Sequence, residues 1–415
     1  MSQPTTIIIF GITGDLSQKK IIPALYDLYR TGRLTETKIV GFSRRPFSDE
    51  EIKNFVSSFL PSDFDERFLG LVSYVQGQFD EPESYQKLSE HLLESDRKNF
   101  DGCSNKLFYL SVPPIFYEMI FSRLADSGLM IPCGGNDGFS RLLVEKPFGN
   151  DLKTAENLDV LLGKLFKESQ IFRIDHYLAK DSLFKIVDLH RRDEGIEKRW
   201  NSENIAEVKI SLFEKGTVGS RGETYDGVGA LRDVGQNHVL QMLALTAMDI
   251  SDLSSPQKIQ AARADVLKNL KTFSQDQILS VVRGQYEGYL SEPKVDNNSE
   301  TETFFRLTAE IETEKFRGVP FVLSAGKGLS KNLTEISVRF KDGMKIVFDV
   351  PAEDSMPAYQ KILLDCINGD QTIFVSTDEI LAEWKFITPI IEGWKNIKPI
   401  SYKIGADPDT IKKNQ

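Results

Sequence analysis

The chain has 415 residues, 40% of them hydrophobic and 27% charged, which is typical of a folded protein with more than one domain. Its formal net charge of −10 argues against a nucleic-acid-binding protein, because such proteins need a basic face. No run approaches the ~18 apolar residues of a membrane span, and no signal peptide is recognisable. Cys103, Cys133 and Cys366 are too few and too scattered for a disulfide framework or a metal site, so we expect a cytoplasmic protein.

The first half of the sequence alternates strand-like and helix-like segments. Thr5–Phe10 is rich in β-branched residues, and Leu16–Tyr29 carries apolar residues at helical spacing. Further strands are expected at Lys38–Phe42, Leu107–Val112 and Arg141–Val144. This alternation predicts a parallel sheet covered by helices on both faces.

The second half changes to alternating strands joined by short connections. The segments NIAEVKISLFE, FFRLTAEIET, LTEISVRF and MKIVFDV predict a mainly antiparallel sheet, accompanied by helices such as SPQKIQAARADVLKNL and EILAEWKFITPIIEGW. We therefore expect a parallel α/β domain followed by a domain built on an antiparallel sheet, with the boundary between about residues 150 and 180.

The turn GITGDL, residues 11–16, joins the first strand to the first helix. Glycines there let backbone N–H groups and a helix N-terminus approach a phosphate closely. The pattern is not the usual G-x-G-x-x-G, so it is also compatible with a tight connection that binds nothing. The next strand ends in GFSRR, where Arg44 and Arg45 would suit the 2′-phosphate of NADP better than the ribose of NAD.

Two further residues lie where ligands bind at the edge of a parallel sheet. Tyr109 stands near the end of a strand that is followed by Pro113 and Pro114. Lys146, in VEKPFG, follows another strand and is expected to be partly buried. A lysine on the surface without a ligand is the alternative interpretation.

Two of the four histidines lie in dense polar clusters. In RIDHYLAKD, a helical turn would put His176 and Lys180 on one face, which suits a phosphate monoester together with Tyr177. In LRDVGQNHVLQML, His238 is expected near the start of a buried helix. Taken alone, it is as compatible with a core histidine as with a catalytic base.

The segments GITGDLSQKK, GFSRR, LFYLSVPP, VEKPFG, RIDHYLAKD, RDVGQNHVLQM, RGQYEGY, GVPF and SAGKGL occur in this order. In this combination the chain resembles the glucose-6-phosphate dehydrogenase family. The resemblance implies oxidation of glucose 6-phosphate at C1 to the 6-phospho-lactone with NADP, the first oxidative step of the pentose phosphate pathway. It also implies an α/β Rossmann domain, over residues 1–175, followed by an α+β domain, over residues 176–415, that is built on a large, mainly antiparallel sheet and serves the substrate and dimerisation. The resemblance implies a homo-oligomer as well, while the composition and charge predict no metal site and no binding to nucleic acid or membrane.

The resemblance also implies roles for individual residues. His238 would be the general base and Asp175 the carboxylate that orients it. The cofactor residues would be Gly11, Ile12, Thr13, Gly14, Asp15, Leu16, Ser17, Gln18, Arg44, Tyr109 and Lys146. The substrate residues would be Lys146, His176, Tyr177, Lys180, Glu214, Asp233, Lys327 and Lys331.

The chain also departs from the family pattern. Ala179 stands where the family has glycine, the helix after Lys180 reads SLFKIVDLHRRDEG, and several dozen residues are missing after MKIVFDV. These departures leave open a dehydrogenase for another phosphosugar, one that prefers NAD, or a non-catalytic NADP(H)-binding sensor.

Overall fold

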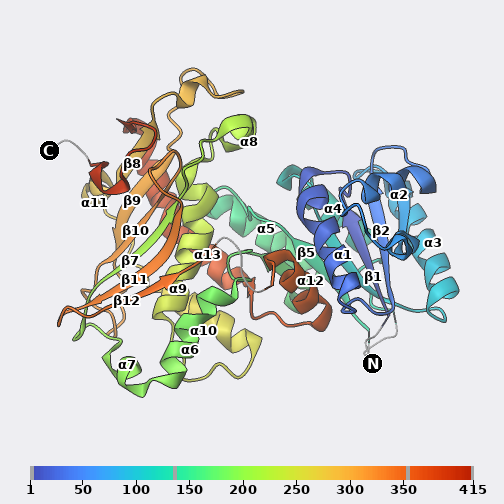
Figure 1. The fold of residues 1–415 in the computed structure, drawn as a ribbon, viewed down its shortest axis with the longest axis horizontal. Coiled ribbons are helices and arrows are strands. Elements are labelled where there is room, and N and C mark those ends of the chain that lie inside the picture. Colours follow the sequence, from blue (N-terminus) through green and yellow to red (C-terminus); the bar gives the residue numbers. More distant parts are fainter. Residues whose placement is uncertain (1–3, 134–137, 352–355, 413–415) are drawn as a thin grey trace. The chain divides into compact units, whose positions relative to one another are not determined.

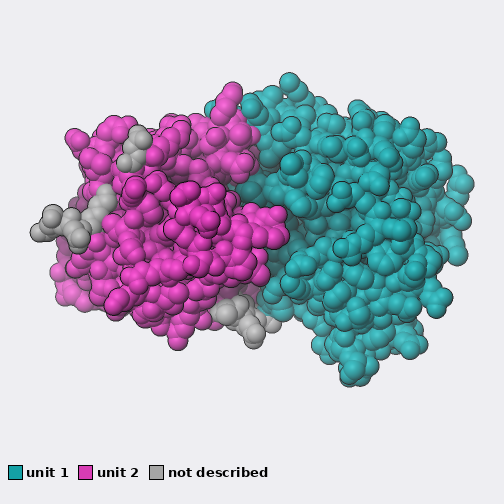
Figure 2. Space-filling view, turned by 90° about the horizontal axis from the view of Figure 1, so that it is seen from above, with its two compact units in different colours: residues 1–148, 156–179, 356–375 teal, residues 149–155, 180–355, 376–415 magenta. Residues whose placement is uncertain are grey.

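The computed structural model describes residues 4–133, 138–351 and 356–412. The chain forms two compact units, which Figure 2 shows in different colours. Unit 1 consists of residues 1–148, 156–179 and 356–375, and unit 2 of residues 149–155, 180–355 and 376–415. The chain passes between the units several times, once at Ala179–Lys180. Among the described residues, no helix is long and apolar enough to span a membrane.

Unit 1 is built on a seven-stranded sheet in the order β13-β6-β5-β4-β1-β2-β3. All neighbours are parallel except β13 and β6, which pair antiparallel. The strands are β1 (Thr5–Phe10), β2 (Thr37–Ser43), β3 (Val72–Gln76), β4 (Asn105–Leu110), β5 (Ser140–Val144), β6 (Ile171–Ile174) and β13 (Phe374–Val375). The chain reverses its direction across the sheet between β1 and β4, which opens a crevice at their carboxyl ends. The predicted Rossmann sheet is confirmed.

Helices lie on both sides of this sheet (Figure 1). They are η1 (Ser17–Ile21), α1 (Ile22–Arg30), α2 (Asp49–Ser57), α3 (Pro82–Asn99), α4 (Tyr117–Asp126), α5 (Leu152–Leu165) and α12 (Ala358–Asn368), with short 3₁₀ turns η2 (Glu66–Leu71), η3 (Pro114–Phe116) and η5 (Glu168–Gln170). The helix expected at Leu16–Tyr29 is therefore a π-helical turn, η1, followed by α1. Gly32 follows that helix with φ 69°, a left-handed conformation that favours glycine.

Unit 1 also contains a segment from late in the chain. Helix α12 contacts α1, where Gln360 Nε2 donates a hydrogen bond to Asp27 Oδ2 at 3.0 Å, and β13 extends the sheet beyond β6. The division into two continuous domains placed this segment in the second domain. Contacts between residues so distant in sequence leave no local pattern from which they could be predicted.

The expectation that the cysteines form no disulfide is wrong for one pair. Cys103 and Cys133 are bonded, with their Cα atoms 5.9 Å apart, whereas Cys366 is a buried free thiol. Cys103 precedes β4 and Cys133 precedes β5, and these strands are parallel neighbours. The parallel pairing brings the two amino ends together, which spacing along the sequence could not reveal.

Unit 2 is built on a second seven-stranded sheet, in the order β12-β11-β7-β10-β9-β8-β14. Its strands are β7 (Ile205–Phe213), β8 (Val282–Tyr286), β9 (Phe304–Ala309), β10 (Phe321–Gly326), β11 (Leu333–Phe340), β12 (Lys345–Asp349) and β14 (Ile400–Tyr402). Most neighbours pair antiparallel, as predicted, but β7 and β10 are parallel, as are β8 and β14. The parallel β7–β10 pair sends two strands to the same edge of the sheet.

The helices of unit 2 include a buried layer against this sheet (Figure 1). They are α6 (Asp181–Arg192), α7 (Glu194–Arg199), α8 (Gly222–Tyr225), η7 (Leu231–Val239), α9 (Leu240–Ala247), α10 (Pro256–Lys268), α11 (Gln275–Ser280) and α13 (Thr377–Gly393), with 3₁₀ turns η6 (Gly219–Arg221), η8 (Tyr289–Ser291), η9 (Trp394–Asn396) and η10 (Pro408–Thr410). Segment η7 is π-helical and runs directly into α9, which is buried throughout. His238 therefore lies in a buried helix, as expected.

Candidate active site

Gly11 determines the shape of the turn after β1, because any larger residue there would displace the neighbouring backbone. Gly11 has φ 77°, and a Cβ added there would lie 2.4 Å from the carbonyl oxygen of Ser111, just beyond β4. The N–H of Gly14 donates to the carbonyl of Gly11 at 2.8 Å, and the helix that continues to Arg30 begins directly afterwards. The turn thus places a helix N-terminus and a backbone without side chains at the crevice, which fits the pyrophosphate of a dinucleotide.

Several side chains of the turn hold it in shape. Ile12 is fully buried, and the buried hydroxyl of Ser17 donates to the carbonyl of Gly11 at 3.1 Å. The amide of Gln18 donates to the carbonyl of Thr13 at 2.8 Å. The contribution of Ile12 and Ser17 to a bound cofactor would therefore come from their backbone N–H groups.

The remaining residues of the turn are more accessible. Asp15 is exposed and pairs with Lys19 at 2.7 Å, one helical turn later, and Leu16 is half-buried. An exposed ion pair of this kind contributes little stability, so Asp15 remains available to solvent or ligand.

Arg44 is exposed at the carboxyl end of β2, beside two aromatic rings. Its guanidinium carbon lies 5.9 Å from the ring centroid of Phe79 and 5.6 Å from that of Phe116. Such contacts orient a guanidinium while its N–H groups stay available. Strand β2 ends in Ser43 rather than in a carboxylate, so this position suits a 2′-phosphate.

A buried hydrogen-bonded group joins β4 to the loop after β5. The Tyr109 hydroxyl donates to Glu145 Oε1 at 2.6 Å, and the Tyr117 hydroxyl donates to the Glu145 carbonyl at 2.9 Å. Burial raises the pKa of Glu145 to about 7, although the hydrogen bond from Tyr109 and the charge of Lys146 act in the opposite direction. Lys146 itself is half-buried, as predicted. Lys146 was predicted from the sequence as a site residue, whereas the neighbouring Glu145 was not.

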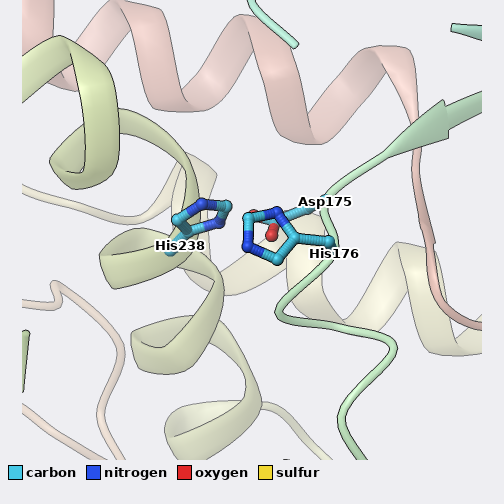
Figure 3. Close-up of side chains that lie close together, drawn as sticks. All are labelled: Asp175, His176 and His238. Atoms are coloured by element: carbon cyan, nitrogen blue, oxygen red, sulfur yellow. The ribbon is translucent and has the colours of Figure 1, made fainter. Parts of the chain in front are cut away.

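The segment after β6 forms a turn rather than a helix. The buried Asp175 accepts a hydrogen bond from the Tyr177 N–H on Oδ1 at 2.9 Å, and its carbonyl accepts one from the Leu178 N–H at 3.0 Å. The idea that a helical turn aligns His176 with Lys180 is therefore not supported, because the carboxylate of Asp175 folds the chain differently. Figure 3 shows Asp175 and His176 on this segment.

His176 lies against an aromatic ring that was not predicted from the sequence. The Tyr359 ring, at the start of α12, is stacked on the His176 imidazole with centroids 6.4 Å apart and planes inclined by 16°. Lys180 belongs to unit 2, where its ammonium donates to the carbonyl of Pro351.

The parallel strands β7 and β10 bring two of the predicted substrate residues together. Phe213 and Gly326 are partners in register, so Glu214 and Lys327 follow side by side. Their side chains form an ion pair, in which Lys327 is almost completely buried and Glu214 is exposed over 45% of its side chain. A buried ammonium beside an accessible carboxylate is well suited to polar groups of a sugar.

Tyr225 connects this pair to Asp233. The Lys327 ammonium lies 5.8 Å from the centroid of the Tyr225 ring. Burial raises the pKa of Tyr225 well above its usual value, and the nearby charge of Asp233 adds to the effect. Lys331 is exposed, with its ammonium 6.0 Å from the Phe213 ring centroid.

His238 lies on η7 and is 1% exposed; Figure 3 shows it on this helical segment. The side chain of Asn237 donates hydrogen bonds to the carbonyls of Arg232, at 3.2 Å, and Asp233, at 3.1 Å. The N–H of Leu240 reaches back five residues to the carbonyl of Gly235, which is the pattern of a π-helix. Because Asp233 and His238 are also five residues apart, the π-helical turn brings them to one face.

The predicted residues thus form one group in each unit. Asp175 and His176 belong to unit 1, and Glu214, Asp233, His238 and Lys327 belong to unit 2. The pairing of Asp175 with His238 stays a prediction.

Comparison with known proteins decides the family. Residues 8–184 match the glucose-6-phosphate dehydrogenase NAD-binding domain, and residues 191–357 and 344–413 match the C-terminal domain of the same family. The chain belongs to the glucose-6-phosphate dehydrogenase family. The C-terminal match comes in two pieces, in agreement with the shortening after β12.

Relatives and solved structures match almost the whole chain. Glucose-6-phosphate 1-dehydrogenase 6, cytoplasmic, of Arabidopsis thaliana is 34% identical over 97% of this chain and 88% of its own length. The Chlamydia muridarum glucose-6-phosphate 1-dehydrogenase is 34% identical over 96% and 92% of the two chains. A glucose-6-phosphate dehydrogenase solved in complex with its substrate glucose 6-phosphate superposes with a TM-score of 0.89 at 30% identity, covering 98% of this chain and 95% of that one.

Proposed function

We propose that the chain oxidises glucose 6-phosphate at C1 to the 6-phospho-lactone and reduces NADP, the first oxidative step of the pentose phosphate pathway. The observation that carries this proposal is the arrangement of unit 2, where His238 follows Asp233 by one π-helical turn and a Glu214–Lys327 pair lies beside Tyr225. Family membership supplies the reaction, and these side chains supply groups of the required kind.

In this proposal, the side chains of the protein remove a proton from the sugar and orient it. His238 takes the proton from the C1 hydroxyl, a task for which an imidazole is suited near neutral pH. Asp175 hydrogen-bonds to the other ring nitrogen and stabilises the imidazolium as it forms. Glu214, Asp233 and Lys327 orient the sugar hydroxyls.

The sugar phosphate is assigned to His176, Tyr177 and Lys180, with Lys331 as a further basic contact. A monoester dianion needs several donors, and a phenol, an imidazole and ammonium groups provide them. This part of the proposal rests on the family resemblance and on the position of Asp175 beside His176.

The residues of the glycine turn, and those at the ends of the neighbouring strands, are suited to binding NADP. Gly11 provides a cradle that a Cβ would fill, Thr13 and the start of the helix provide N–H groups, and Arg44 is exposed at the end of β2. Tyr109 lies on β4 and Lys146 in the loop after β5, beside the crevice. Bound NADP would accept the hydride from C1.

The test is a spectrophotometric assay at about 340 nm with glucose 6-phosphate and either NADP or NAD, because reduced nicotinamide absorbs there. We expect turnover with glucose 6-phosphate, and better turnover with NADP than with NAD. Absence of turnover with glucose 6-phosphate, combined with activity on another phosphosugar, would contradict the substrate assignment. Binding of NADPH without reduction of NADP by any phosphosugar would favour a sensor.

The protein is further proposed to act in the cytoplasm as a homo-oligomer. A cytoplasmic isoform is among its relatives, and the homo-oligomer is what the family resemblance implies. Because the chain is shortened after β12, sedimentation analysis is the direct test. A monomer at micromolar concentration would contradict the oligomer.

A further inference from the structure

A buried carboxylate from a distant part of the chain contacts the helix that carries His238. Glu383, on α13, is 2% exposed. Its Oε2 accepts a hydrogen bond from Gln236 Nε2 at 2.8 Å, and its Oε1 accepts one from Gln241 Nε2, also at 2.8 Å. Both glutamines are buried, one on η7 and the other on α9.

The spacing of the two glutamines depends on the π-helical turn. In an α-helix, residues five apart point about 140° away from each other, because each residue turns the chain by about 100°. In a π-helix, the i→i+5 hydrogen bond returns residue i+5 to the face of residue i. Gln236 and Gln241 are five apart, so one carboxylate binds both amides only when the π-helical turn is present.

The same turn determines the position of the proposed base. Asp233 and His238 are also five residues apart, and only the π-helical register puts a sugar-binding carboxylate and the base on one face. Gly235 favours this register as well, since a Cβ there would lie 2.8 Å from the Phe305 ring of β9. The contacts of Gln236, Gln241 and Gly235, on other faces of the helix, thus determine the face on which His238 lies.

The burial of Glu383 is unfavourable in free energy and is not explained by stability alone. A buried carboxylate loses hydration, and well-packed apolar residues are often as stable at such positions. Buried polar groups are best documented where they fix the register of a helix. We propose that Glu383 is a positioning residue that holds η7 in the π-helical register and thereby places His238 for proton removal.

A neighbouring carboxylate serves as a matched control. Glu379 lies one turn earlier on α13, is completely buried and accepts a hydrogen bond from Arg263 Nε on α10 at 2.7 Å. Within the described part of the chain, its carboxylate bonds to Arg263 and to Ser376 at the start of α13, and not to η7. Loss of this carboxylate should reduce stability without changing the register.

The experiment compares Glu383→Gln with Glu379→Gln in the full-length protein. A glutamine offers one acceptor oxygen, so only one of the two amides keeps its partner. For Glu383→Gln we expect kcat with glucose 6-phosphate to fall at least tenfold, while the Kd for NADPH stays within twofold because unit 1 is untouched. For Glu379→Gln we expect a lower melting temperature and a kcat within threefold of wild type.

A second readout is independent of activity. The chain has four histidines, so their imidazole resonances can be resolved by NMR and that of His238 assigned with His238→Asn. Glu383→Gln should shift the His238 resonance and its titration midpoint, whereas Glu379→Gln should leave both unchanged. The kinetic part of this inference rests on the proposed function, but the resonance shift does not. A wild-type protein inactive on glucose 6-phosphate would contradict the proposed function while the shift still supported the positioning role.

Two results would overturn the inference. One is a folded Glu383→Gln variant whose kcat and His238 resonance match wild type. The other is an equal shift of the His238 resonance in Glu379→Gln, which would indicate general loosening. If Glu383→Gln does not fold, Gln241→Met removes one amide and keeps the carboxylate; it should shift the same resonance, and an unchanged resonance would contradict the inference.

Discussion

The two units each contain a π-helical segment at a proposed binding position, and the two are held differently. Segment η1, in unit 1, follows the glycine turn and is fixed mainly by neighbours in sequence, such as the bond from Ser17 to Gly11. Segment η7, in unit 2, is fixed by Glu383, which is 147 residues from Gln236. The first turn can form from local interactions, whereas the second needs most of unit 2 to be folded.

This difference has a consequence for the effects of substitutions. Changes around η1 should act on cofactor affinity and leave unit 2 unaffected. Changes around η7 should act on the rate of the chemical step, because the buried layer positions His238. Substitutions in the two units should therefore separate effects on cofactor affinity from effects on the rate of the chemical step.

The largest expected effect is on the base in unit 2. His238→Asn should lower kcat by about 10²–10⁴-fold, the usual contribution of a general base, with little change in the Kd of glucose 6-phosphate. Single-turnover kinetics and equilibrium binding measure the two quantities. His91→Asn is the control, because His91 bonds to Ser73 in unit 1 and should leave kcat unchanged. Wild-type turnover in His238→Asn would remove this residue from the mechanism.

The second prediction concerns cofactor choice in unit 1. Arg44→Ala should weaken NADP by about 10–100-fold, since a charge-assisted hydrogen bond contributes about 1.5–3 kcal/mol. The affinity for NAD, which lacks the 2′-phosphate, should change little. Fluorescence titration with both reduced cofactors measures this, with Arg30→Ala on α1 as a control. An equal loss for both cofactors would mean that Arg44 does not contact the 2′-phosphate.

The third prediction uses the raised pKa of Glu145. Between its ordinary pKa of 4.5 and about 7, the folded protein keeps this proton while the unfolded chain loses it. The contribution of Glu145 to the free energy of unfolding therefore falls as pH rises, by at most about 1.4 kcal/mol per pH unit. Glu145→Gln keeps an acceptor for Tyr109 but has no such proton.

Urea unfolding of Glu145→Gln and wild type at several values between pH 4.5 and 8 tests this directly. The stability of the variant relative to wild type should rise through this window and level off above about pH 7, where both states of the wild type are ionised. A difference independent of pH would show that the Glu145 pKa is ordinary. Glu118→Gln, on the exposed side of α4, is the control for the loss of a carboxylate at the surface.

The smallest effect on activity is expected for the disulfide. Cys103 and Cys133 lie at the amino ends of β4 and β5, opposite the carboxyl ends where the glycine turn lies. The bond closes a loop of 30 residues, so its removal costs about 3–4 kcal/mol in the chain-entropy treatment. Cys133→Ser should lower the melting temperature and leave kcat unchanged; a large loss of kcat would place this edge of the sheet closer to the chemistry than we infer.

Features that depend on neighbouring residues could be predicted from the sequence, whereas features that depend on contacts between distant segments could not. Strands β1, β2, β4 and β5 of unit 1, the glycine turn and the partial burial of Lys146 follow from local patterns, because each depends on neighbouring residues. The disulfide, the Tyr359 ring beside His176 and the transfer of α12 to unit 1 depend on pairing between distant segments. Glu383 could not be recognised either, since a glutamate in an amphipathic helix is usually exposed.

Asp175 and His238 are proposed to act as one catalytic unit, although they belong to different parts of the chain. The most direct measurement is a double-mutant cycle of kcat with Asp175→Asn, His238→Asn and both together. If Asp175 acts through His238, the double variant should be no slower than His238→Asn alone, within about threefold, because residues that act as a unit are strongly non-additive. If the two losses multiply, the residues act independently and the claim is wrong.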